Sequence, residues 1–67
     1  MTIDQAREIR DIFNRKANEG GYLARGKMSA DQAHTVKRGT ALEASQKGIF
    51  VGCSVKDVDK ALQLAKK

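Results

Sequence analysis

The chain has 67 residues, of which 40% are hydrophobic and 31% charged, and its 13 lysines and arginines against 8 acidic residues leave a net charge of +5 at pH 7. This composition indicates one small globular domain and excludes a disordered chain. A single cysteine excludes an internal disulfide, so the small core has no covalent support and homodimerisation would add to its stability.

No targeting or membrane segment is recognisable. The N-terminal segment MTIDQAREIR lacks the basic and apolar regions of a signal peptide, and the longest run of large apolar residues, IFV, is too short to cross a membrane. A lone cysteine is also typical of a reducing compartment. We therefore expect a cytoplasmic protein that does not enter a membrane.

Four short patterns predict the starts of helices along the chain. The capping box S/T-x-x-E/Q, in which two side chains satisfy the first backbone amides of a helix, begins at Thr2, Ser29 and Thr40. Ser54 begins a weaker version that ends in an aspartate. A helix is predicted to follow each of these four residues.

The first helix is predicted over residues 3–18, because apolar residues recur at three- and four-residue spacing from Ile3 through Ile9 to Ala17. Four basic and four acidic residues cancel between residues 1 and 19, so this helix is expected to be a scaffold rather than a charged surface. Gly20 is expected to end it in the left-handed conformation.

Residues 29–48 allow either one helix or two. As two helices, the first ends at Arg38, Gly39 takes the left-handed conformation, and Thr40 caps a second helix whose Leu42 faces inward. As one helix, small residues from Ala30 to Ala44 share a face and Leu42 lies outside it. A glycine inside a helix costs only about 1 kcal/mol against alanine, but we favour two helices that meet at Gly39.

Two short segments lie between the predicted helices. Tyr22-Leu23 is either an extended piece or a loop, and Ile49-Val51 has β-propensity before a bend at Gly52. The last helix is predicted over residues 55–66. The predicted fold is therefore an all-α bundle of three or four helices, with room for a minimal two-stranded pairing of Tyr22-Leu23 with Ile49-Val51.

Catalysis and metal binding lack the necessary groups. The chain has one histidine, His34, and one cysteine, Cys53, far apart in sequence, and no cluster of histidines and cysteines that could bind a metal. Cys53 precedes the cap Ser54, where a thiol can have a lowered pKa and backbone amides can bind an anion, but a small buried residue is the favoured interpretation. We expect no enzyme, cofactor or metal.

The surplus of positive charge lies in the middle and the C-terminal part of the chain. A basic surface on a small helical domain is typical of nucleic-acid binding, so the leading hypothesis is a small regulator that binds DNA or RNA. The alternative is a protein-binding module, an inhibitor or adaptor that can be homodimeric and acts on an acidic protein partner. The candidate binding residues are Arg25, Lys27, Lys37, Arg38 and Lys47.

Overall fold

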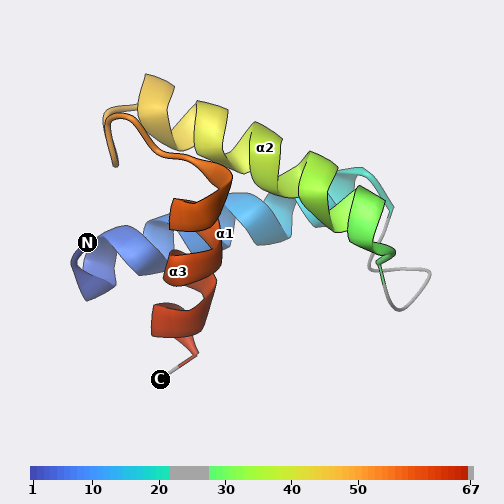
Figure 1. Cartoon of the computed structure of the whole chain (residues 1–67), viewed down its shortest axis with the longest axis horizontal. Helices are drawn as coiled ribbons and strands as arrows, with labels where there is room; N and C mark the ends of the chain where they lie inside the picture. Colours follow the sequence, from blue (N-terminus) through green and yellow to red (C-terminus); the bar gives the residue numbers. More distant parts are fainter. Residues whose placement is uncertain (22–27, 67) are drawn as a thin grey trace.

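A computed structural model of the chain describes residues 1–21 and 28–66 and contains three helices (Figure 1). They are α1 (Ile3–Glu19), α2 (Ala30–Gln46) and α3 (Val55–Ala65). Helices α1 and α2 lie antiparallel, and α3 crosses α1 and begins beside the middle of α2 (Figure 1). The first half of α2 extends beyond α3 toward the end of α1. The predicted all-α bundle is confirmed, with three helices.

Each helix begins with a complete capping box. The hydroxyls of Thr2, Ser29 and Ser54 accept hydrogen bonds from the third backbone amide of their helices, at 3.1, 3.2 and 3.4 Å. In return, a side chain at that third position accepts from the amide of the cap residue. These third-position residues are Gln5, Gln32 and Asp57. Three of the four predicted start signals are therefore confirmed.

The core lies where the three helices meet, and α1 packs against both of the others. The largest fully buried side chains come one from each helix and are Ile9, Thr40 and Val58. Many of the remaining core residues are alanines, so the helix backbones can approach one another without large side chains between them. The buried hydrophobic residues are Ala6, Ile9, Ile12, Phe13, Ala17, Val36, Ala41, Ala44, Val58 and Ala61.

Helix α2 continues through Gly39, so the prediction of two helices that meet there was wrong. Gly39 is not among the glycines with positive φ, and Thr40 does not cap a new helix. The Thr40 side chain is buried, and its hydroxyl donates to the carbonyl oxygen of Val36, one turn earlier in the same helix, at 2.8 Å. Leu42 is 60% exposed. This exposure is what one continuous helix requires, because Leu42 then lies outside the buried small-residue face. A break would remove the small-residue face from the core, which costs more than one glycine in a helix.

The segments around the helices differ from the predictions at two points. Gly20 has φ −76°, and the left-handed conformation at the end of α1 belongs to Gly21, with φ 73°. Residues 49–51 form a bend after α2 and no strand, because the amides of Ile49 and Phe50 both donate to the carbonyl of Ala44. The other half of the predicted pairing, residues 22–23, lies outside the described residues.

None of the three helices combines the length and the apolar character that a bilayer-spanning helix needs.

Candidate binding groove between α2 and α3

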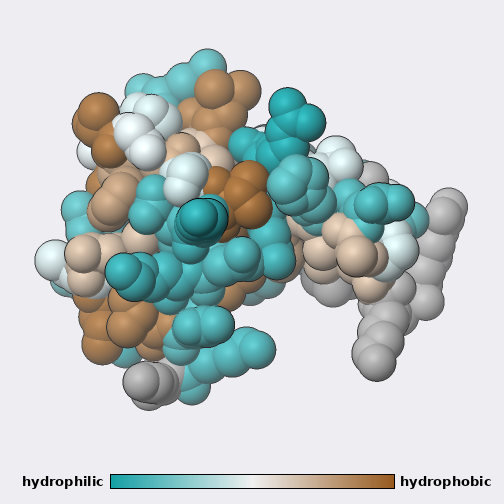
Figure 2. Space-filling view, viewed as in Figure 1, coloured by the Kyte–Doolittle hydropathy of each residue, from teal (hydrophilic) through white to brown (hydrophobic). Residues whose placement is uncertain are grey.

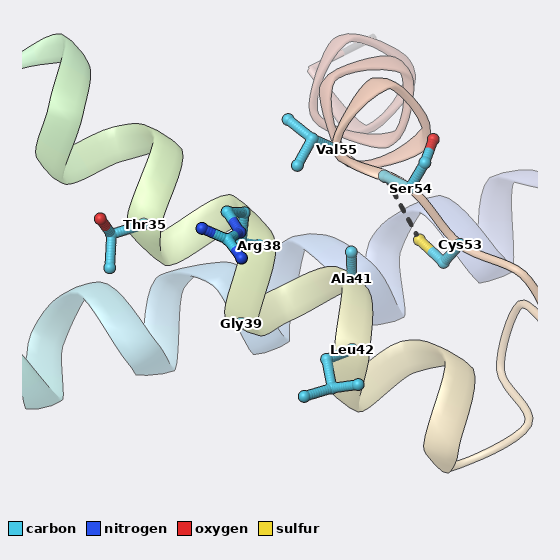
Figure 3. A pocket seen from close by; sticks show the side chains of 8 residues that line it. All are labelled: Thr35, Arg38, Gly39, Ala41, Leu42, Cys53, Ser54 and Val55. Atoms are coloured by element: carbon cyan, nitrogen blue, oxygen red, sulfur yellow. Dashed lines mark hydrogen bonds between the residues drawn. The ribbon is translucent and has the colours of Figure 1, made fainter.

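An open groove with a volume of about 590 Å³ lies between the middle of α2 and the start of α3 (Figure 3). Most of its lining is apolar. Figure 2 shows apolar surface where α3 begins beside α2, with hydrophilic residues around it. The groove is lined by Thr35, Arg38, Gly39, Ala41 and Leu42 of α2 and by Cys53, Ser54 and Val55 at the start of α3.

The α2 wall of the groove combines an apolar side chain with a cation. Arg38 and Leu42 are four residues apart, so they lie one turn apart on the same exposed side of α2. Val55 comes from α3, on the other side of the groove (Figure 3). Within the described residues Arg38 forms no ion pair. Leu42 and Arg38 thus place an exposed apolar side chain and a cation together at the edge of an apolar groove, a combination that protein interfaces also use.

The segment at the start of α3 has its backbone amides engaged internally. The amide of Gly52 donates to the hydroxyl of Ser45 at 3.3 Å, and the amide of Cys53 donates to the carbonyl of Phe50 at 3.1 Å. The amide of the next residue donates to the Asp57 carboxylate at 2.9 Å. The anion-binding alternative for these amides is therefore not supported, because an internal carboxylate already occupies the helix N-terminus.

The pKa values of Asp57 and Cys53, at the start of α3, are both shifted from their ordinary values. Hydrogen bonds from the backbone amide and the hydroxyl of Ser54 hold the pKa of Asp57 below its ordinary value. Burial raises the pKa of the Cys53 thiol, and the nearby Asp57 carboxylate raises it further. The Cys53 thiol donates a hydrogen bond to the carbonyl oxygen of Ser54, with 3.7 Å between sulfur and oxygen (Figure 3). The alternative of a thiol with lowered pKa is thus wrong, and Cys53 is a partly buried packing residue.

The predicted basic residues occupy different environments. Lys37 is paired with Asp59 of α3, with 2.6 Å between nitrogen and oxygen, and Lys47 is paired with Glu43 at 3.2 Å. Arg38 is exposed and lines the groove. The other two candidates, Arg25 and Lys27, lie outside the described residues. The structure therefore places one of the five in the groove and uses two of them in internal ion pairs.

Glu43 is the centre of an ion-pair cluster that joins α1 to α2. Its carboxylate accepts from Arg15, and it lies 3.4 Å from the ammonium of Lys16 and 3.2 Å from that of Lys47. Burial of the carboxylate raises its pKa, but the hydrogen bonds from Lys47, Arg15 and Lys16 outweigh this effect and lower the pKa of Glu43 to about 2. The pairing of Glu43 with Lys47 could be predicted from their spacing of one helical turn. The contacts of Glu43 with Arg15 and Lys16 could not, because they join two different helices.

We expect the stabilising effect of Glu43 to depend on pH. Its pKa of about 2 lies below the ordinary 4.5, so the unfolded chain takes up the proton first as the pH falls. Glu43→Gln should lower the free energy of unfolding by about 1 kcal/mol at pH 7, since partly exposed ion pairs are screened by solvent. This difference should persist down to about pH 5 and disappear toward pH 2.

Urea denaturation of both proteins at pH 7, 5 and 3 measures the effect. The control is Glu8→Gln on α1, whose carboxylate is exposed and forms no ion pair within the described residues. It should show no comparable change with pH. A Glu43→Gln deficit of the same size at pH 3 and pH 7 would contradict the role of the carboxylate charge.

The described residues contain no group of three or more histidine, cysteine or acidic side chains that could hold a metal ion. His34 is exposed on α2 and is not part of the groove lining, whereas Cys53 is. Among the described residues, the hydrogen bond of the Cys53 thiol goes to a backbone carbonyl and not to a side chain that could act as its base. Comparison of the chain with protein-family models, with curated proteins and with solved structures gave no match.

Proposed function

We propose that the protein is a non-enzymatic protein-binding module, an inhibitor or adaptor, that docks on an acidic partner protein through the groove between α2 and α3. The observation that carries this proposal is the combination of exposed Leu42 and unpaired Arg38 on one wall of an apolar groove, within the described residues. Protein interfaces have an apolar centre, in which arginine is enriched, and a polar rim.

The placement of the cations favours a protein partner over a nucleic acid. A phosphate backbone is bound by several cations that each release counterions, and the affinity falls with every cation that is already neutralised. Lys37 and Lys47 are neutralised by acidic residues of the same chain. The groove instead offers one cation beside apolar surface, which suits a partner that contributes both a carboxylate and apolar side chains.

A nucleic-acid-binding regulator is the second candidate, and a different surface favours it. Lys56 and Lys60 of α3, and Lys66, which caps its C-terminal end, are exposed and form no ion pair within the described part of the chain. These three lysines are available to contact phosphates. The net charge of +5 is consistent with such a surface.

Two binding measurements distinguish the candidates. Fluorescence anisotropy with a labelled DNA duplex, single-stranded DNA and single-stranded RNA should show no binding tighter than the non-specific range, which is a Kd of about 10⁻⁶ to 10⁻⁴ M at physiological salt. In a pull-down from an extract of the source organism, the immobilised parent chain should retain a partner protein. The variants Arg38→Glu and Leu42→Asp should each fail to retain that protein. Lys56→Glu is the matched control for charge, and it should retain the same protein.

The opposite pattern would support the second candidate. Tight binding of a nucleic acid, with a slope of log affinity against log salt that flattens by about 0.7–0.9 for each cation reversed on α3, would overturn the protein-binding proposal. Lys37 is left unchanged in these tests, although it is one of the candidate binding residues. Reversal of Lys37 would place a second carboxylate beside Asp59 and destabilise the contact between α2 and α3.

A further inference from the structure

We infer that the groove receives a short amphipathic helix of the partner, which inserts an apolar side chain between Leu42 and Val55 and places a carboxylate against Arg38. This inference rests on the proposed function and adds the conformation and the chemistry of the bound segment. It follows from three properties of the groove: the backbone groups around it, its length and its charge.

The described backbone around the groove offers no row of unpaired amides to which an extended peptide could add as a strand. The α2 wall is helical throughout, and the amides of residues 52, 53 and 54 are engaged by Ser45, Phe50 and Asp57. A peptide that binds as an added strand needs a row of unpaired backbone groups on its host. A helix satisfies its own backbone and needs only side-chain contacts from the groove. The groove therefore suits a helical segment.

The length of the groove suits about two turns of helix. The lining residues of α2 extend from Thr35 to Leu42, which is seven residue steps along the helix and therefore about 10 Å at 1.5 Å per step. A helix that lies in such a groove contacts it with side chains three, four and seven positions apart. Leu42 and Val55 lie on opposite sides of the groove, so one apolar side chain between them would contact both helices (Figure 3).

The charge of the groove selects an acidic segment. None of the eight lining residues is acidic, and Arg38 stands one turn from Leu42 on the same wall. A bound carboxylate one turn from the inserted apolar side chain would match this spacing. A second copy of this chain is disfavoured as the occupant, because each copy carries a net charge of +5 and most of its described acidic residues are already used in ion pairs or caps.

Selection from peptide libraries tests the inference on the full chain. One library displays a stable single helix with one face randomised, and a second displays linear peptides with a proline in the middle of the randomised segment. Both are selected against the immobilised protein and depleted against Leu42→Asp. We expect enrichment only from the helical library. The enriched helices should carry Asp or Glu three or four positions from a large apolar residue.

Charge reversal with compensation then tests the contact with Arg38. The affinity of an enriched helix for Arg38→Glu should fall by about 10-fold or more, and replacement of the helix carboxylate by lysine should restore it. Lys56→Glu, which makes the same change of charge outside the groove, should change the affinity by less than about 2-fold. Thermal unfolding should show that the variants are folded, since Arg38 and Leu42 are both exposed.

Each outcome bears on a different part of the inference. Enriched linear peptides that lose affinity for Arg38→Glu would overturn the helical conformation and leave the proposed function intact. Enriched helices that bind Arg38→Glu as tightly as the parent, or that lose as much affinity for Lys56→Glu, would overturn the role of Arg38. Failure of both libraries to yield a binder that distinguishes the parent from Leu42→Asp would overturn the groove as a protein-binding site.

Discussion

Ile9→Ala will leave the chain largely unfolded at 37 °C. Ile9 is fully buried on the face of α1 that packs against the other two helices, and it is one of the largest fully buried side chains. Truncation of a buried isoleucine to alanine costs about 2–5 kcal/mol. A single core in a chain of this size rarely supplies more than about 3–5 kcal/mol. Circular dichroism at 222 nm during thermal unfolding should show a transition at or below 37 °C.

The same substitution at Ile3 is the matched control. Ile3 lies on the same helix but is 49% exposed, so Ile3→Ala removes little buried surface and replaces a β-branched residue with a better helix former. Its free energy of unfolding should stay within about 0.5 kcal/mol of the parent. Equal losses at both positions would mean that α1 does not use this face for the core.

Gly39→Ala should raise the free energy of unfolding by about 1 kcal/mol and the melting temperature by about 4–8 °C. Gly39 lies inside α2 without positive φ, so alanine fits its backbone and restricts the unfolded chain. A Cβ at this position would lie 3.5 Å from Cδ of Lys16, which is an ordinary van der Waals contact. Differential scanning calorimetry of the two proteins measures the gain.

Gly48→Ala provides the opposite case. Gly48 follows α2 with φ 73°, a conformation that costs an alanine about 1–2 kcal/mol, although a Cβ there would meet no other atom within 4 Å. This variant should therefore be less stable than the parent, while Gly39→Ala should be more stable. A loss of stability in Gly39→Ala would mean that α2 bends or breaks at that residue.

The sequence predicted α1 and α3 well because each combines a capping box with one strong apolar face. Helix α2 was harder, since its buried face consists of small residues and its largest apolar residue, Leu42, is exposed. Thr40 and Glu43 match a capping box in sequence. In the folded chain the threonine hydroxyl bonds within its own helix, and the glutamate bonds to α1. A local pattern cannot reveal that a distant helix supplies a better partner.

The candidate groove could be predicted only in part. The choice of Arg38 followed from the excess of cations in the middle of the chain. In the one-helix alternative, Leu42 already lies outside the small-residue face, which indicates exposure. Val55 and Cys53 join these residues only because α3 begins beside α2, and that placement depends on tertiary packing of α3 against α1. Helical periodicity gives the faces of each helix but not the angle at which two helices cross.

The three capping boxes also have a consequence for the speed and order of folding. Because each helix carries its own start signal, short-lived helices can form in about a microsecond or less before any of them meet. Helices α1 and α2, and likewise α2 and α3, are neighbours in the chain, whereas the contact of α3 with α1 spans the whole of α2 and therefore costs more loop-closure entropy. Until Val58 reaches the core, the apolar face of α1 is covered on one side only. The groove has one wall from α2 and one from the start of α3, so it exists only once α3 lies beside α2.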